Sequence, residues 1–162
     1  MTPAVRLPVK IGLAVAVAII VLDQITKVWI LEGVMQPPRL IEVTPFFNLV
    51  LAWNRGVSFG MFNTQSDYGA YILIALALVI VAGMAVWLWR SESRWTGIAI
   101  GLVIGGAIGN VIDRLLYGAV VDFLDFHAFG YHWPAFNAAD SAICVGAGML
   151  ILESLFVPRE TS

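Results

Sequence analysis

The chain has 162 residues, of which 60% are hydrophobic and 12% are charged, and its formal net charge is −2. Soluble domains contain roughly 45–50% apolar residues, whereas the mean hydropathy here is +0.88. The composition therefore excludes an ordinary soluble domain and predicts one integral membrane domain over residues 1–162. It also gives no basic surface for a nucleic-acid partner.

Four stretches have the length and apolarity of transmembrane helices, which need about 20 residues. We expect these spans at residues 9–31, 68–89, 95–117 and 138–157. Basic residues precede the first apolar stretch as they do in a signal peptide. No small-residue cleavage site follows, so we interpret the stretch as a retained span.

The loop after the first span has its own pattern. Residues 46–53 are extended and aromatic-rich, Asn54-Arg55-Gly56 is a turn signal, and residues 57–62 continue with a second extended pattern. The sequence thus predicts an all-α membrane protein, a four-transmembrane-helix bundle with a small extracytoplasmic β-hairpin in the first outer loop.

Basic residues indicate how the spans are oriented. They lie before the first span, between the second and third, and after the fourth, at Arg6, Lys10, Arg90, Arg94 and Arg159. The positive-inside rule then places both termini in the cytoplasm and both longer loops outside.

Polar residues inside the spans gather at one depth, near the outer leaflet. Ionisable groups are costly in lipid, and such positions indicate a function by default. The group comprises Asp23 and Lys27 in the first span, Asn110, Asp113 and Arg114 in the third, and Asp140 at the start of the fourth. The third span also has glycine at every fourth position from Gly97 to Gly109, which predicts close approach by a neighbouring helix.

Several of these residues also have a structural interpretation. Asp23 and Lys27 are four apart and suit an ion pair on one helix face. Arg114 shares a face with Asn110. Asn137 can cap the fourth span, and an acid three residues later suits the helix dipole.

The residues of the chain allow few catalytic mechanisms. A serine or cysteine nucleophile needs a histidine base, and both histidines, His127 and His132, lie in one loop. Neither they nor the single Cys144 form a pattern of metal ligands. We expect no metal and no cofactor. Asp122 and Asp140 remain, and two close carboxylates can act as an acid and a base.

Five segments of the chain resemble lipoprotein signal peptidase, the type II signal peptidase of bacteria. They are residues 23–27 (DQITK), 54–59 (NRGVSF), 105–114 (GGAIGNVIDR), 120–123 (VVDF) and 134–141 (PAFNAADS). Each segment alone is weak, but their order on a four-span chain makes the resemblance specific.

The resemblance implies an aspartyl endopeptidase of the bacterial cytoplasmic membrane. Such an enzyme removes the signal peptide from diacylglyceryl-modified prolipoproteins, cutting just before the lipidated cysteine at the outer leaflet. It also implies a β-cradle in the first outer loop and inhibition by globomycin-type compounds. Asp122 and Asp140 match the catalytic dyad. The positions implied to support the dyad or bind substrate are Asp23, Lys27, Asn54, Gly56, Asn110, Arg114, Asn137 and Ala138.

The residues alone leave two other classes of function open. A small transporter or proton-conducting protein also uses ionisable groups in its spans, although a relay would place them across the whole thickness. A scaffold would use the aromatic loop but leave the aspartates unexplained. Asp125, in the same loop as Asp122, has no assigned role. A monomer that contacts membrane lipid is the default expectation.

Overall fold

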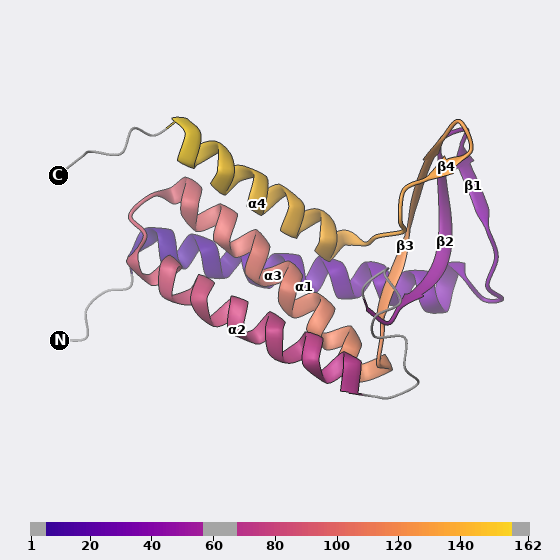
Figure 1. Ribbon diagram of the computed structural model, residues 1–162, viewed down its shortest axis with the longest axis horizontal. Helices are drawn as coiled ribbons and strands as arrows, with labels where there is room; N and C mark the ends of the chain where they lie inside the picture. The colour runs from indigo at the N-terminus through magenta and orange to yellow at the C-terminus, as the bar shows by residue number, and fades with distance from the viewer. Residues whose placement is uncertain (1–5, 57–67, 157–162) are drawn as a thin grey trace.

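Four long helices form a bundle in the computed structural model, which describes residues 6–56 and 68–156. They are α1 (Leu7–Val28), α2 (Tyr68–Arg90), α3 (Arg94–Tyr117) and α4 (Ala138–Phe156), and a π-helical segment, η1 (Trp29–Val34), continues α1. All four are long and apolar enough to cross a membrane. They overlap the four predicted spans. A small β-sheet lies at one end of the bundle, and the first and last described residues lie at the other (Figure 1).

Helix α3 is the centre of the bundle and packs most extensively against α1 and α4. Three of its glycines, Gly97, Gly101 and Gly105, face the backbone of α1. A Cβ atom added at Gly97 would lie 2.6 Å from the carbonyl oxygen of Pro8, and one added at Gly105 would lie 2.7 Å from that of Ala16. The predicted close approach is confirmed, because any larger residue would push α1 away.

The sheet is antiparallel, with its four strands in the order β1-β2-β3-β4. The strands are β1 (Ile41–Thr44), β2 (Phe47–Asn54), β3 (Val120–Ala128) and β4 (Tyr131–His132). Phe129 and Gly130 join β3 to β4 with φ angles of 52° and 81°. Positive φ at both positions is typical of the type I′ turn, which suits the twist of a hairpin.

Both outer loops contribute to this sheet, whereas the sequence predicted a hairpin in the first loop alone. Strand β2 covers the predicted extended segment and ends at Asn54, but its partners are β1 and β3. The second half of the predicted hairpin, residues 57–62, lies outside the described residues. The second loop, in which no strand was predicted, forms β3 and β4.

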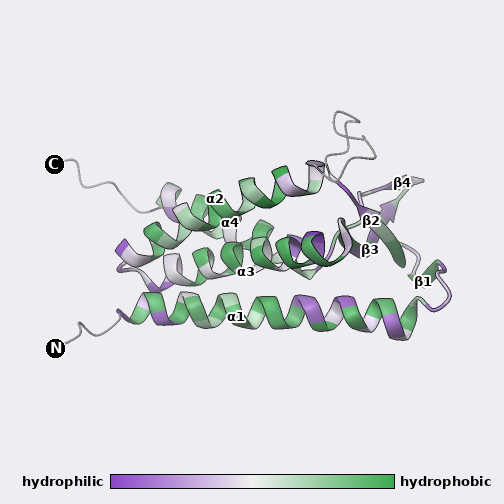
Figure 2. Ribbon diagram, turned by 90° about the horizontal axis from the view of Figure 1, so that it is seen from below, coloured by the Kyte–Doolittle hydropathy of each residue, from purple (hydrophilic) through white to green (hydrophobic). Residues whose placement is uncertain are grey.

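A small apolar core fixes the sheet to the end of α1. Ile30, Met35 and Phe123 are buried together, with residues of β1 and β2 packed around them. Figure 2 shows apolar residues along the four helices, with hydrophilic residues mostly toward the helix ends, while the sheet carries both kinds. The packing therefore places β3 above the polar ends of α1, α3 and α4.

Candidate active site

Asp122 comes to the site on strand β3. Helix α3 ends at Tyr117 and is capped by Gly118, which has a φ of 69° and donates its backbone N–H to Arg114 O at 3.0 Å. Such a left-handed residue ends a helix and reverses the chain. Strand β3 then starts at Val120 and passes back across the end of the bundle, so the Asp122 carboxylate is only 2% exposed.

Asp140 comes to the site on the first turn of α4. Its backbone N–H donates to Asn137 Oδ1 at 2.9 Å, and the Asn137 N–H donates back to Asp140 Oδ2 at 3.2 Å. This reciprocal pair has the geometry of a capping box. The second Asp140 oxygen, Oδ1, accepts from Asn110 Nδ2 of α3 at 2.8 Å. The predicted capping role of Asn137 is therefore confirmed.

Asn137 also joins the two aspartates. It is fully buried, and its Nδ2 donates to Asp122 Oδ1 at 2.7 Å while its backbone contacts Asp140. Burial raises the pKa of Asp122 to about 6, and the negative charge of Asp140 adds to the effect, against amide donors from Asn54 and Asn137. One carboxyl of this pair is thus ready to exchange a proton near neutral pH.

Asn54 holds Asp122 from the other side. Its Nδ2 donates to Asp122 Oδ2 at 3.0 Å, and its Oδ1 accepts from the Gly56 N–H at 3.1 Å. The second bond is an Asx turn, which fixes the orientation of the amide. Gly56 has a φ of +136°, a conformation that favours glycine. The two residues therefore act as one local unit.

A second polar layer lies beneath the dyad. Lys27 Nζ is 2.7 Å from Asp23 Oδ2, 2.8 Å from Asp113 Oδ2 and 3.2 Å from Asn110 Oδ1. Gln24 Nε2 donates to Asp113 Oδ1 at 3.0 Å. The predicted pair of Asp23 and Lys27 is thus present, and Asp113 and Gln24 complete it. Asp113 belonged to the predicted polar group without a role at the dyad, and Gln24 was not part of that group.

Arg114 lies at the edge of this network. Its Nη1 donates to the backbone carbonyl of Asn110 at 3.3 Å, and its charge is within electrostatic range of Asp113, Asp122 and Asp140. Within residues 6–56 and 68–156, its buried Nε has no hydrogen-bond partner. Ala138 lies between the capping residue Asn137 and Ala139, and its side chain offers no polar contact to the dyad.

The histidines lie elsewhere on the sheet. The rings of His127 and His132 stack at 4.8 Å, and His132 Nδ1 is 2.9 Å from Asp125 Oδ1. Asp125 also accepts from Asn48 Nδ2 at 2.9 Å. Burial opposes the charge of Asp125, but these two hydrogen bonds and the two histidines lower its pKa overall. Asp125 is therefore a sheet residue, separate from the dyad.

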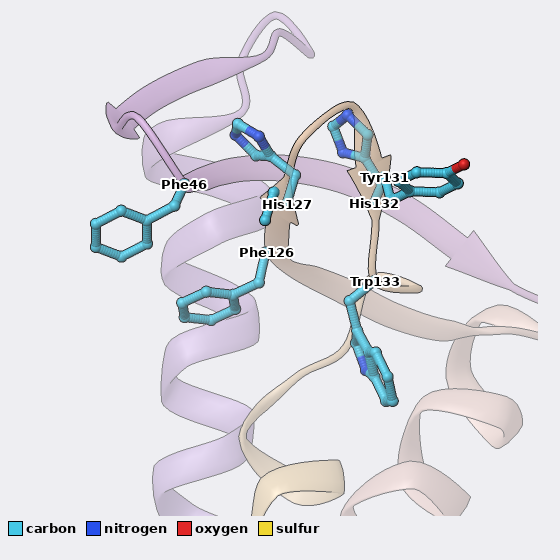
Figure 3. A pocket seen from close by; sticks show the side chains of 7 residues that line it. Phe46, Phe126, His127, Tyr131, His132 and Trp133 are labelled. Atoms are coloured by element: carbon cyan, nitrogen blue, oxygen red, sulfur yellow. The ribbon is translucent and has the colours of Figure 1, made fainter.

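A cavity of about 470 Å³ lies beside these histidines (Figure 3). It is lined by Phe46, Phe126, His127, Ala128, Tyr131, His132 and Trp133. None of these belongs to the dyad. Among the described residues, no group of three or more His, Cys, Asp or Glu side chains could hold a metal ion.

Known proteins are similar to this chain in sequence and fold. A family described as "Signal peptidase (SPase) II" matches residues 15–156. The lipoprotein signal peptidase of Rhodopseudomonas palustris is 46% identical over 153 residues, covering 91% of this chain and 93% of the relative. That of Nitrobacter hamburgensis is 47% identical over 152 residues, covering 91% and 93%.

A solved structure described as a bacterial membrane enzyme has the same fold. It superposes with a TM-score of 0.76 at 31% identity, covering 93% of this chain and 94% of the other. Its likeness extends over the helices and the sheet together, because the match covers nearly all of both chains.

Proposed function

The chain belongs to the signal peptidase (SPase) II family, and on this premise we propose that it is an aspartyl endopeptidase with Asp122 and Asp140 as its catalytic dyad. Its substrates are prolipoproteins that carry diacylglycerol on a cysteine. It cuts the peptide bond just before that cysteine and releases the signal peptide.

The observation that carries this proposal is the shared surroundings of the two carboxylates. Asn137 contacts both, and Asp122 is buried with a pKa raised to about 6, first by burial and then by the charge of Asp140. Two coupled carboxyls of this kind hold one proton between them. That state provides a base and an acid in one site.

The reaction follows from these protonation states. The ionised carboxyl takes a proton from a water molecule as the water oxygen attacks the carbonyl carbon of the scissile bond. The protonated carboxyl gives its proton to the amide nitrogen as the carbon–nitrogen bond breaks. The site regains its single proton because one is taken up and one is released. Asn54, Asn110 and Asn137 hold the carboxylates in place, while Arg114 places positive charge beside them.

We place the dyad at the outer leaflet of the bacterial cytoplasmic membrane. Arg6, Lys10, Arg90 and Arg94 belong to the end of the bundle away from the sheet (Figure 1), and the positive-inside rule assigns that end to the cytoplasm. A substrate whose acyl chains stay in the outer leaflet then presents its cysteine at the depth of the dyad. We expect globomycin-type inhibitors to bind there as well.

A transporter or proton-conducting function finds less support. Among the described residues, the fully buried charged side chains are Asp23, Lys27, Asp113 and Asp122, with Asp125 6% exposed, and all belong to the sheet end of the molecule. A relay needs ionisable groups across the whole membrane thickness. We propose that the protein acts as a monomer.

The test is cleavage of a diacylglyceryl-modified prolipoprotein by purified protein, with the products mapped by mass spectrometry. We expect one product that begins at the lipidated cysteine. Asp122→Asn and Asp140→Asn should each lower kcat roughly 100- to 10,000-fold, the usual contribution of a general acid or base. Both should keep the thermal stability of a folded bundle.

Asp125→Asn is the matched control, since Asp125 lies on the same strand but bonds to Asn48 and His132. This variant should cleave at nearly the wild-type rate. Cleavage at another bond, or wild-type turnover by either dyad variant, would contradict the proposal.

A further inference from the structure

Two buried aspartates outside the dyad each accept a backbone N–H from the residue immediately before a dyad aspartate. Asp23 Oδ1 accepts from the Ala139 N–H at 3.0 Å, and Ala139 precedes Asp140. Asp113 Oδ2 accepts from the Val121 N–H at 3.0 Å, and Val121 precedes Asp122. The same contact is thus made twice, once from α1 to α4 and once from α3 to β3.

One cation joins these two acceptors. Lys27 Nζ lies 2.7 Å from Asp23 Oδ2 and 2.8 Å from Asp113 Oδ2. Gln24 forms a second link, because its Nε2 lies 3.0 Å from Asp113 Oδ1 and 3.2 Å from Asp23 Oδ2. Lys27 and Gln24 each contact both Asp23 and Asp113, so these contacts fix the separation of Asp23 and Asp113.

We propose that Asp23, Lys27 and Asp113 are positioning residues that set the separation of Asp122 and Asp140 for the cleavage reaction. We call these three residues the positioning cluster. The inference rests on the proposed function, and it assigns Asp113 a role in that function. It also explains why a bundle already held by glycine contacts contains buried charges.

Strand β3 is paired with β2 on both sides of Asp122, at Val121 and at Leu124. Leu124 N–H and Phe123 N–H both donate to Phe136 O, at 2.9 Å and 3.0 Å, which ties β3 to the chain leading into α4. These bonds lie on the C-terminal side of Asp122. The positioning cluster adds a side-chain restraint on the N-terminal side, because Asp113 holds the Val121 N–H and links β3 to α3 and, through Lys27, to α1.

Stability gives a weak reason for such a cluster. Asp23 and Asp113 are fully buried and Lys27 is 2% exposed, so all three have lost their hydration. Buried ion pairs are often no more stabilising than well-packed apolar residues of the same size. Geometry gives a stronger reason, because a displacement of about 1 Å at a reacting group can cost about 100-fold in rate.

The experiment compares kcat, KM and thermal stability in Asp113→Asn, Asp113→Glu and Lys27→Met. The glutamate keeps the charge beside Lys27 but moves the acceptor of the Val121 N–H by one methylene. We expect all three variants to lower kcat about 10- to 100-fold with KM within about twofold of wild type, since the dyad is displaced while the substrate surface is unchanged.

Glu153→Gln is the matched control at the far end of the bundle. Glu153 Oε1 accepts from Thr96 Oγ1 at 2.6 Å, a contact that also joins two helices through a carboxylate. This variant should keep kcat. The double variant of Asp23→Asn with Asp113→Asn should be little slower than the worse single variant, because both act through one cation.

Wild-type kcat in folded Asp113→Glu, or variants that lose only thermal stability, would overturn the inference. If the single variants do not fold, the neutral triple variant Asp23→Asn, Lys27→Met, Asp113→Asn leaves no unpaired buried charge in the cluster. It should fold and remain at least about tenfold slower, and a wild-type kcat would again overturn the inference. Failure of the proposed function is a separate result, seen as normal cleavage by Asp122→Asn and Asp140→Asn.

Discussion

Helix α3 meets its neighbours in two different ways at its two ends. Toward the end away from the sheet, Gly97 and Gly101 face the backbone of α1 with no room for a side chain. Toward the sheet, Asn110 and Asp113 meet Lys27 of α1 through polar contacts of 2.8–3.2 Å. At the end away from the sheet the glycines of α3 meet α1 by shape, and at the sheet end α3 meets α1 by charge and hydrogen bonding.

The two modes meet at Gly109. A Cβ atom added there would lie 2.6 Å from Asp23 Oδ2, so the last glycine of the stripe makes space for the first acid of the polar layer. The two ends of α3 therefore have different roles. Glycine packing fixes the distance and register of the helices, and this rigidity allows polar groups at the other end to keep the separations that catalysis needs.

The largest effect that tests this division is expected at Asn137. Alanine there removes the 2.7 Å donor to Asp122 and the cap of α4. We expect kcat to fall roughly 100- to 1,000-fold, as when a preorganised donor is removed from an active site. The lost cap should lower the free energy of unfolding by only about 1 kcal/mol. Cleavage assays and thermal melts in detergent measure the two effects.

Asn48→Ala is the control for this variant. Asn48 is also a buried amide, and it donates to Asp125 of β3 at 2.9 Å. Its loss should destabilise the sheet without a comparable loss of kcat. Equal losses of activity in the two variants would show that general damage to the sheet, rather than the contact with the dyad, slows the enzyme.

The next largest effect is a pH dependence of protein stability that originates at Asp122 in the sheet. The folded-state pKa of Asp122 is about 6 against an ordinary 3.8, raised by burial and then by Asp140 of α4, and opposed in part by Lys27 of α1. Folding therefore favours the protonated carboxyl. Its stabilising contribution is complete below pH 3.8 and is lost as the pH rises through 6.

The size of this effect follows from the shift in pKa. A shift from 3.8 to about 6 corresponds to roughly 3 kcal/mol. Thermal melts between about pH 4.5 and 7.5 should therefore show the highest stability at the acidic end. Asp122→Asn should flatten this dependence. A dependence that persists unchanged in Asp122→Asn would assign it to other groups and remove the evidence for a raised pKa.

The sequence predicted the bundle and the meeting of the polar groups because both follow from span direction. Apolar length gave the four helices, and basic residues gave their alternation, which brings Asp23, Asn110 and Asp140 to one end. The capping role of Asn137 was also predictable, because a capping box is a local pattern.

The contacts that depend on long-range pairing could not be predicted in the same way. Val120–Ala128 forms strand β3, but its partner β2 comes from the other outer loop, and nothing local specifies that pairing. No partner for Asp113 was predicted, and its partner Lys27 lies on another helix. Only the rotation of α1 against α3 decides this, and packing sets that rotation. The available signal in the sequence was Lys27, because a lysine buried beside Asp23 can pair with a second acid.

The smallest effect tests the glycine end of the comparison. A Cβ atom at Gly101 would collide with the carbonyl oxygen of Gly12, so Gly101→Ala must separate α1 from α3. Overpacking of this kind costs about 1–3 kcal/mol. Gly148→Ala is the control, since nothing lies within 4 Å of a Cβ atom there, and alanine should be neutral or favourable in that helix.

Thermal melts should therefore separate the two alanine variants, and cleavage assays should show what the lost packing does to the dyad. If glycine packing supports the polar end, Gly101→Ala will lower kcat less than Asn137→Ala but more than Gly148→Ala does. Its pH dependence of stability should stay that of wild type, because Asp122 keeps its surroundings. Unchanged stability in Gly101→Ala would mean that α1 and α3 can separate freely, and the rigidity ascribed to the glycine end would then have to come from the polar contacts themselves.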